Sequence, residues 1–228
     1  MEKDIEKNEA DEARVRPVSV SPAVIKRLPR YFRYLRELIR EGKLRISSAE
    51  LSARMNVTAS QIRQDLNCFG GFGQQGYGYN VNYLYTKISE LLGVGEGYSA
   101  VIVGAGNLGR ALVRNPMFEK RGVDVIGLFD VSPDVVGRQV GALTVRHMDD
   151  MVDFFAKNKV DIAVLTLPKA ASFDVMRQLV ALGVRGFWNF TGVEAEAVCP
   201  GVAVENVHLG DSLMTLCYNL RTADEEDV

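Results

Sequence analysis

The first apolar pattern along the chain predicts an amphipathic helix. Three or four positions separate Leu28, Phe32, Leu35 and Ile39. Ser21-Pro22 precedes them and is typical of a helix N-terminus, because serine caps the first amides and proline has no amide hydrogen to leave unpaired. We expect this helix to end at Gly42 and to be kinked or interrupted near Pro29. Its other face is basic and carries Lys26, Arg27, Arg30, Arg33, Arg36 and Arg40.

Two short helices joined by a tight turn are predicted next. Either serine of Ser47-Ser48 can cap a helix near Ala49–Met55, and Asn56-Val57 supplies the turn. Thr58 begins the second helix, where Thr58 and Gln61 have the spacing of a reciprocal capping box.

The second of these helices has one apolar and one polar face. Ile62 and Leu66 lie one turn apart and are expected to face inward. The outward residues are Ser60, Arg63, Gln64 and Asn67. Two such helices are typical of a helix-turn-helix, although this geometry also occurs in domains that never touch nucleic acid.

Glycine and aromatic residues alternate over residues 69–79, which read FGGFGQQGYGY. This pattern predicts a glycine-turned β-hairpin with Gln74 and Gln75 exposed at its tip. The hairpin and the preceding helices together predict a winged helix.

The pattern changes after a linker helix around Val81–Leu92 and a flexible stretch, Gly93–Gly97, which we interpret as a domain boundary. Short apolar runs then alternate with helical segments. The predicted strands are Ala100–Val103, Val125–Phe129, Leu143–Val145, Ile162–Leu167 and Gly186–Phe190. The predicted helices lie near Asn107–Asn115, Asp149–Lys157 and Ala170–Ala181. Such alternation predicts a doubly wound parallel sheet of the Rossmann type.

A G-x-G-x-x-G motif follows the first of these strands and consists of Gly104, Ala105, Gly106, Asn107, Leu108 and Gly109. Its glycines allow a tight turn, close approach of a pyrophosphate and packing of the helix on the strand. Asp130 and Val131 end the second strand about 20 residues downstream, where a carboxylate accepts from ribose hydroxyls. The carboxylate would repel a 2′-phosphate, so the motif predicts binding of NAD and NADH.

Two further strand ends are expected to complete this site. Thr166 and Pro168 follow one strand, and Asn189 and Phe190 follow another. Ligands of open α/β sheets lie outside the carboxyl ends of the strands. We therefore expect the first pair beside the pyrophosphate or nicotinamide ribose, and the second pair near the nicotinamide.

A last helix is predicted from Gly210-Asp211-Ser212 onward, with a seam formed by Leu209, Leu213, Leu216 and Leu220. It can pack on its own domain or insert into a partner subunit. We favour dimerisation, because helix-turn-helix proteins usually pair to reach two half-sites.

Charge is unevenly distributed along the 228 residues. From Pro17 to Asn80 there are ten basic and four acidic residues, whereas from Val81 to Val228 there are thirteen and nineteen. A basic block joined to an acidic one suggests two functions and a polyanion as the partner of the first. No apolar stretch reaches the roughly 18 residues of a membrane span, and the acidic start lacks the apolar core of a secretory signal, so we expect a cytoplasmic protein. Three scattered cysteines and two histidines predict no metal site.

The sequence offers no sign of catalysis. The dinucleotide fold nearly consumes the second half, and His147 and His208 have no evident partners for acid–base chemistry. We therefore predict a protein that is not an enzyme. The alternatives are a small NAD-dependent oxidoreductase with an accessory helical domain, and a CoA-binding module, which would not need a carboxylate at Asp130.

Several segments together resemble the bacterial redox-sensing transcriptional repressor family Rex. They are SSAELSARMNVTASQIRQDLNCFGGFGQQGYGYNV, VIVGAGNLGRAL, FDVSPDVVGRQVG, LTLP, GFWNF and VENVHLGDSLMTL, and they span nearly everything from Ser21 to Leu220. The resemblance implies a homodimer with an N-terminal winged helix, a Rossmann domain and a C-terminal helix exchanged between subunits. It also implies repression at a palindromic operator when NADH is scarce and release when NADH rises.

On DNA we assign Ser60, Gln61, Arg63 and Gln64 to the major groove and Arg45 to a phosphate. Gln74 and Gln75 stand where family members often carry Lys or Arg at the wing tip, which favours hydrogen bonding in the minor groove. Two further departures from the family pattern are Asn115, in place of a tyrosine near the nicotinamide, and Gly192, in place of a proline.

The domain organisation that we predict has four parts. They are a mobile tail over 1–16, a winged-helix DNA-binding domain over 17–85, a Rossmann domain over 86–208, and a dimerisation helix with an acidic tail over 209–228.

Overall fold

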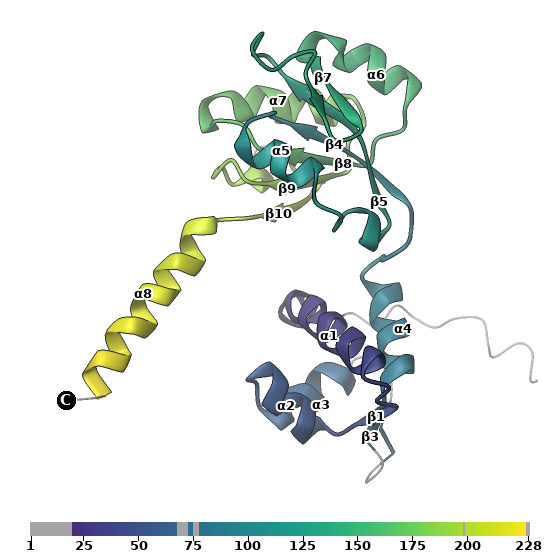
Figure 1. Ribbon diagram of the computed structural model, residues 1–228, viewed down its shortest axis with the longest axis vertical. Coiled ribbons are helices and arrows are strands. Elements are labelled where there is room, and N and C mark those ends of the chain that lie inside the picture. The colour runs from purple at the N-terminus through teal and green to yellow at the C-terminus, as the bar shows by residue number, and fades with distance from the viewer. Residues whose placement is uncertain (1–19, 68–72, 75–77, 198, 227–228) are drawn as a thin grey trace, which may run out of the picture. The chain divides into compact units, whose positions relative to one another are not determined.

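The computed structural model describes residues 20–67, 73–74, 78–197 and 199–226. The chain forms two compact units, Met1–Val94 and Gly95–Val228 (Figure 1). The predicted tail and Gln75 lie outside the described residues. No helix among the described residues is long and apolar enough to cross a membrane.

The described residues of the N-terminal unit form four helices and a small antiparallel sheet, and Figure 1 shows their arrangement. The helices are α1 (Pro22–Arg40), α2 (Ser48–Met55), α3 (Ala59–Asn67) and α4 (Val81–Leu91). The strands are β1 (Arg45–Ile46), β2 (Gly73–Gln74) and β3 (Gly78–Asn80), in the order β1-β3-β2. Helix α2, helix α3 and the β2–β3 pair confirm the predicted winged helix-turn-helix.

Local sequence signals explain how these helices begin. The Ser21 side chain accepts from the Val24 amide at the start of α1, and Ser47 forms a complete capping box with Glu50 at the start of α2. The predicted box at Thr58 is only half formed, because the Thr58 hydroxyl accepts from the Gln61 amide while the Gln61 side chain bonds elsewhere. Helix α1 continues through Pro29, so the predicted interruption is wrong.

Helix α4 belongs to the core of the N-terminal unit and does not serve only as a linker. Val81, Leu84 and Ile88 are fully buried, and the rings of Phe32 and Tyr85 stack with centroids 4.7 Å apart. The division between the units falls at Val94 and Gly95, within the stretch Gly93–Gly97 that we interpreted as a boundary and nine residues beyond the expected 85/86 division.

The second unit contains a seven-stranded sheet in the order β10-β9-β8-β4-β5-β7-β6. The strands are β4 (Tyr98–Val103), β5 (Val123–Asp130), β6 (Gln139–Val140), β7 (Leu143–His147), β8 (Ile162–Leu165), β9 (Gly186–Asn189) and β10 (Ala203–Asn206). All neighbouring pairs are parallel except β6–β7. The six parallel strands have the order of a Rossmann fold, and this confirms the predicted fold class. Strands β6 and β10 were not predicted.

Helices cover both faces of this sheet (Figure 1). The helices on the sheet are α5 (Asn107–Val113), α6 (Met151–Lys157) and α7 (Lys169–Ala181), with short 3-10 turns at Glu119–Arg121, Met148–Asp150 and Ala195–Ala197. Phe154 of α6 and Met176 of α7 pack with Val103 on one face, whereas Leu112 of α5 packs with Ile102 on the other. Crossovers on both sides explain why the central strands are apolar throughout.

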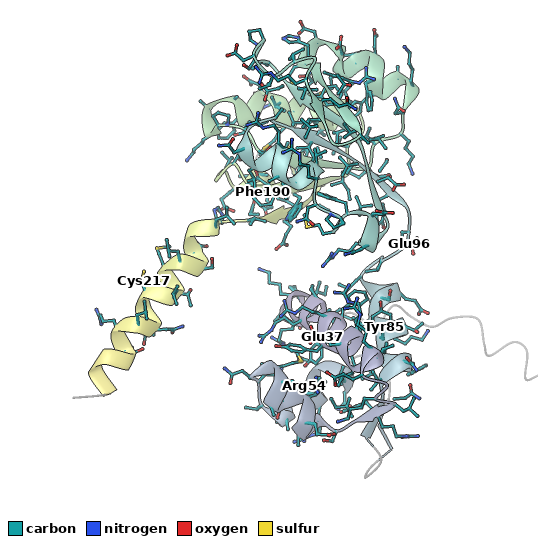
Figure 2. All side chains as sticks on the ribbon, viewed as in Figure 1. Glu37, Arg54, Tyr85, Glu96, Phe190 and Cys217 are labelled. Carbon is teal, nitrogen blue, oxygen red and sulfur yellow. The ribbon has the colours of Figure 1, made fainter. Side chains whose placement is uncertain are left out.

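The last helix, α8 (Leu209–Glu226), carries the predicted leucine seam entirely exposed. Leu209, Leu213, Leu216 and Leu220 are each more than half exposed, and Cys217 stands out from the same helix (Figure 2). Packing of this seam on its own domain, one of the two predicted options, is absent from the described chain. Exchange between subunits remains a prediction.

Candidate dinucleotide site and nucleic-acid interface

The glycine turn between β4 and α5 has three glycines with three different roles. Gly104 has φ +106°, and a Cβ there would lie 2.5 Å from the Thr166 carbonyl oxygen. A Cβ at Gly109 would lie 1.9 Å from the Gly104 carbonyl oxygen, so α5 packs directly on the turn. A Cβ at Gly106 would meet nothing within 4 Å. Gly106 therefore keeps the backbone bare toward open space, where a pyrophosphate needs access.

Asp130 holds this turn in shape. One carboxylate oxygen accepts from the Ala105 amide at 2.6 Å, and the other accepts from the Ser132 amide at 2.8 Å. Each carboxylate oxygen has a further lone pair, so Asp130 can still accept from ribose hydroxyls. The carboxylate thus serves the protein's own backbone as well as the expected ligand.

A cavity of about 460 Å³ lies against the turn at the carboxyl ends of the strands. Its lining includes Gly104, Gly106, Asp130, Val131, Thr166 and Pro168. The strand order reverses between β4 and β8, which is where ligands bind in open α/β sheets. The structure therefore brings the predicted glycine, acid and β8-end residues together around one cavity.

Thr166 has a role in the turn that sequence reasoning missed. Its hydroxyl lies 2.8 Å from the Gly104 carbonyl oxygen and 3.2 Å from that of Val103. It therefore fastens the end of β8 to the glycine turn. Ala105 is fully buried and Leu108 packs against the apolar cluster beneath α5, so these two motif residues contribute through backbone and packing.

Asn189 and Phe190 do not line this cavity. The Asn189 amide donates to the Val193 carbonyl at 2.6 Å and to Asn206 at 2.8 Å, while its oxygen accepts from the Thr191 hydroxyl at 2.7 Å. Asn189 is 1% exposed and holds the loop after β9. Phe190 packs edge-on against Trp188 at 4.8 Å. The strand-end rule located these residues but could not give their side-chain directions.

Five further lining residues were absent from the predicted set: Val103, Met148, Leu167, Ala171 and Val175. Met148 directly follows β7, so the same strand-end rule could have found it. Ala171 and Val175 lie one turn apart on α7, where only the helix phase would have indicated them. Asn115 accepts from the Met117 amide through its side chain at 3.0 Å, which ties it into a local turn.

Helix α3 exposes the face that was predicted to point outward. Ser60, Arg63 and Gln64 are exposed, and Ile62 and Leu66 are buried as predicted. Arg63 donates to the Ser48 hydroxyl at 3.2 Å, across to α2. Arg45 is exposed on β1, beside the wing strands.

Gln61 points toward a buried carboxylate. Asp65 is fully buried on α3 and accepts from four donors: Arg27 through two nitrogens, each at 2.7 Å, Tyr31 at 2.9 Å and Gln61 at 2.8 Å. Burial by itself would raise the pKa of Asp65, but the hydrogen bonds from Arg27, Gln61 and Tyr31 together lower it. Burial and the hydrogen bond to Asp65 raise the pKa of Tyr31. This cluster of hydrogen bonds ties α3, the second helix of the helix-turn-helix, to α1.

The basic face of α1 is consequently not all available to DNA. Arg27 is engaged by Asp65, and Arg30 donates to the carbonyl oxygen of Met55 at the last turn of α2. An arginine at a helix C-terminus satisfies an orphan carbonyl and the helix dipole. On α1, the basic residues Lys26, Arg33 and Arg40 remain exposed.

A winged helix-turn-helix unit and a Rossmann unit with a preformed glycine turn define a DNA-binding regulator that responds to a dinucleotide. Comparisons with known proteins agree. The models "Putative DNA-binding protein N-terminus" and "CoA binding domain" match residues 19–67 and 95–193. The redox-sensing transcriptional repressor Rex of Caldicellulosiruptor saccharolyticus is 50% identical over 202 residues, which cover 89% of this chain and 92% of that protein. The chain belongs to the Rex family.

Other relatives and solved structures support this assignment. Rex of Clostridioides difficile is 49% identical over 203 residues, covering 89% of this chain and 96% of that protein. The crystal structure of RSP with β-NAD+ and operator DNA has a TM-score of 0.82 and 47% identity, covering 91% of this chain and 95% of that one. RSP with β-NADH has a TM-score of 0.83 and 44% identity, covering 92% and 98%. The relatives are named as regulators, which excludes the oxidoreductase alternative.

Proposed function

We propose that this protein represses transcription from a palindromic operator when NADH is scarce and leaves the operator when NADH binds. The preformed glycine turn with Asp130, on the same chain as a winged helix-turn-helix, carries this proposal. It is supported by solved relatives of the family, one with NADH and one with NAD+ and operator DNA. Both the operator and the dinucleotide pool belong to the cytoplasm, which is where we expect the protein.

The dinucleotide would be held by the residues around the 460 Å³ cavity. Gly106 gives the pyrophosphate access to bare backbone, Asp130 accepts from the adenosine ribose, and Val131, 67% exposed, offers an apolar surface beside it. Thr166 and Pro168 form the wall on the β8 side. Asn189 is a positioning residue that fixes the loop bearing Phe190.

On DNA, Ser60, Arg63 and Gln64 would face base edges in the major groove. Arg63 is the best candidate to read guanine, because a guanidinium can bond both O6 and N7. Arg45 would contact a phosphate, and the wing residues Gln74 and Gln75 the minor groove. Gln61, which the sequence assigned to the major groove, donates a hydrogen bond to Asp65, and we propose that it orients this carboxylate.

A homodimer would place two recognition helices on the two halves of the palindrome, about 34 Å apart for successive major grooves. The exposed leucine seam of α8 is the surface we assign to subunit pairing. NADH would favour a dimer in which the helices are wrongly spaced. A coupling of about 1–3 kcal/mol changes operator affinity roughly 5- to 150-fold, and linkage requires the operator to weaken NADH binding by the same factor.

Gel shift of the full-length protein on a palindromic site, with NAD+, NADH or CoA added, tests the proposal. NADH should release the DNA, whereas NAD+ and CoA should not. Arg63→Ala should lose the operator but keep NADH binding, and Asp130→Leu should keep the operator but lose the response. Equal NADH affinity with and without operator would contradict the proposed coupling.

A further inference from the structure

A second hollow, of about 340 Å³, lies between α5, the segment after β5, and strands β6 and β7. Three arginines border it: Arg110 from α5, Arg114 from the C-cap of α5, and Arg138 from the segment before β6. Its other polar residues are Asn107 and Gln139. No carboxylate is among the residues that line it, and none of its lining residues belongs to the dinucleotide cavity.

Among the residues that the structure describes, no carboxylate pairs with the three guanidinium groups. Arg110 donates to the neutral Asn107 oxygen at 2.8 Å and forms no ion pair with a described residue. Arg114 and Arg138 form no ion pair with any residue that the structure describes. Arg114 also borders a neighbouring hollow with Glu119 and Asp124, but neither acid comes within the 4.0 Å of an ion pair. In the described part of the chain, the positive charges of these three arginines are therefore not balanced by a paired carboxylate.

The three arginines repel one another, and their clustering is not explained by a basic composition of this part of the chain. Arg110 lies on α5 and Arg114 is the residue that caps its C-terminus, so two like charges stand four positions apart, a spacing at which they repel. Arg138 adds a third positive charge from another element. Yet the part of the chain that carries them is acidic, with nineteen acidic residues against thirteen basic ones from Val81 onward.

We propose that this arginine pocket, formed by Arg110, Arg114 and Arg138, is a second anion site that binds a small molecule carrying a diphosphate or triphosphate group. Guanidinium forks match phosphate oxygens in pairs. Three positive charges complement an anion of two to four negative charges, and the hollow lies within the roughly 300–1,000 Å³ range of small-molecule sites. Of the three, only Arg110 bonds to a residue of the glycine motif among the described contacts, and that residue is Asn107, which also borders this hollow.

Isothermal titration of the full-length protein with inorganic pyrophosphate tests this assignment, with and without saturating NADH. We expect one site per chain under both conditions, because the arginine pocket shares no lining residue with the dinucleotide cavity. Arg110→Gln and Arg138→Gln should each weaken pyrophosphate binding at least tenfold. Arg138→Lys should bind pyrophosphate better than Arg138→Gln but less well than the wild type, because lysine keeps the positive charge but lacks the paired N–H donors of the guanidinium.

Arg177→Gln is the matched control. It removes the same charge from an exposed residue of α7, which pairs with Asp174 at 3.6 Å on the opposite face of the sheet. This variant should bind pyrophosphate as the wild type does. Melting curves of all variants, read at Trp188, verify that the Rossmann unit is folded.

Three results would overturn the proposal. One is no pyrophosphate binding, and a second is binding that NADH abolishes, which would place the anion at the glycine turn. The third is equal weakening by Arg177→Gln, which would indicate only a general charge effect. Loss of operator affinity in Arg110→Gln and Arg138→Gln without pyrophosphate binding would identify the cluster as a contact to DNA phosphates.

Discussion

Replacement of Asp65 by alanine removes the acceptor that joins the recognition helix to α1. The Asp65 side chain is 0% exposed, whereas the partner Arg27 keeps 27% of its side chain exposed. In Asp65→Ala the Arg27 guanidinium and the buried Tyr31 hydroxyl lose their shared partner. The perturbation therefore removes the shared acceptor of one charge, one buried hydroxyl and the side-chain amide of Gln61 inside the N-terminal unit.

The magnitude follows from this geometry. Removal of one partner of a buried ion pair costs about 3–5 kcal/mol. Because Arg27 can still reach water, the lower end applies, and we expect the free energy of unfolding of the N-terminal unit to fall by about 3 kcal/mol. Tyr31→Phe removes only the bond of 2.9 Å to the same carboxylate and should cost about 1.5–2 kcal/mol.

Urea unfolding followed by far-UV circular dichroism measures this loss, and the fluorescence of Trp188, the single tryptophan, reports the other unit. The tryptophan transition should not move. Glu90→Gln is the control, because it breaks an exposed ion pair with Lys87 at 2.7 Å and should leave the free energy of unfolding close to that of the wild type. Operator affinity of Asp65→Ala should fall while NADH affinity stays at the wild-type value.

Equal unfolding energies for Asp65→Ala and Glu90→Gln would refute the reasoning. So would a Tyr31→Phe effect larger than that of Asp65→Ala, because the hydroxyl makes only one of the four bonds to the carboxylate. A variant that is destabilised by about 3 kcal/mol but binds operator normally under folding conditions would show that the cluster serves stability alone.

Three further predictions concern other parts of the molecule. Gly109→Ala would force a Cβ to 1.9 Å from the Gly104 carbonyl oxygen, so it should cost about 1–3 kcal/mol of stability or displace the turn, and NADH titration should show weaker binding. Arg63→Ala should relax sequence preference in competition assays on mutated sites, whereas Arg45→Ala should weaken all sites alike and reduce the salt dependence of binding. Burial would raise the pKa of Asp161, but the Ser99 amide, Arg185 and Lys159 lower it to about 2. The stability that this carboxylate contributes is therefore full above its unfolded pKa of about 4 and is lost as the pH falls toward 2, so the urea midpoints of wild type and Asp161→Asn should converge over that range.

Periodicity and capping residues were sufficient to predict most helices and the central strands. The segments that were missed lack an apolar run. Strand β10 consists of Ala203–Asn206, which alternate between exposed and half-buried at the edge of the sheet, and β6 has only two residues. Such strands exist because a neighbouring strand offers hydrogen bonds, and a single sequence does not show this neighbour.

The candidate sites were predictable in position but not in side-chain direction. The glycine motif and Asp130 could be placed because backbone conformation dictates their residue types. Gln61 was assigned to DNA although it was not among the residues expected to face outward, and it lies four positions before Asp65 and bonds to it. An aspartate between inward-facing Ile62 and Leu66, opposite an arginine and a tyrosine four apart on α1, was the signal that would have indicated the buried cluster.

The glycine turn also limits where redox sensing can arise. Asp130 already accepts from Ala105 and Ser132, and Thr166 already fastens Gly104, so this half of the site is preorganised. NAD+ and NADH are identical in the adenosine and pyrophosphate portions that such a turn binds. A contact made equally with both forms adds affinity but shifts no equilibrium between protein states. Discrimination must therefore come from groups that meet the nicotinamide end. Substitutions around Gly106 should weaken NAD+ and NADH binding by similar factors and leave their ratio unchanged.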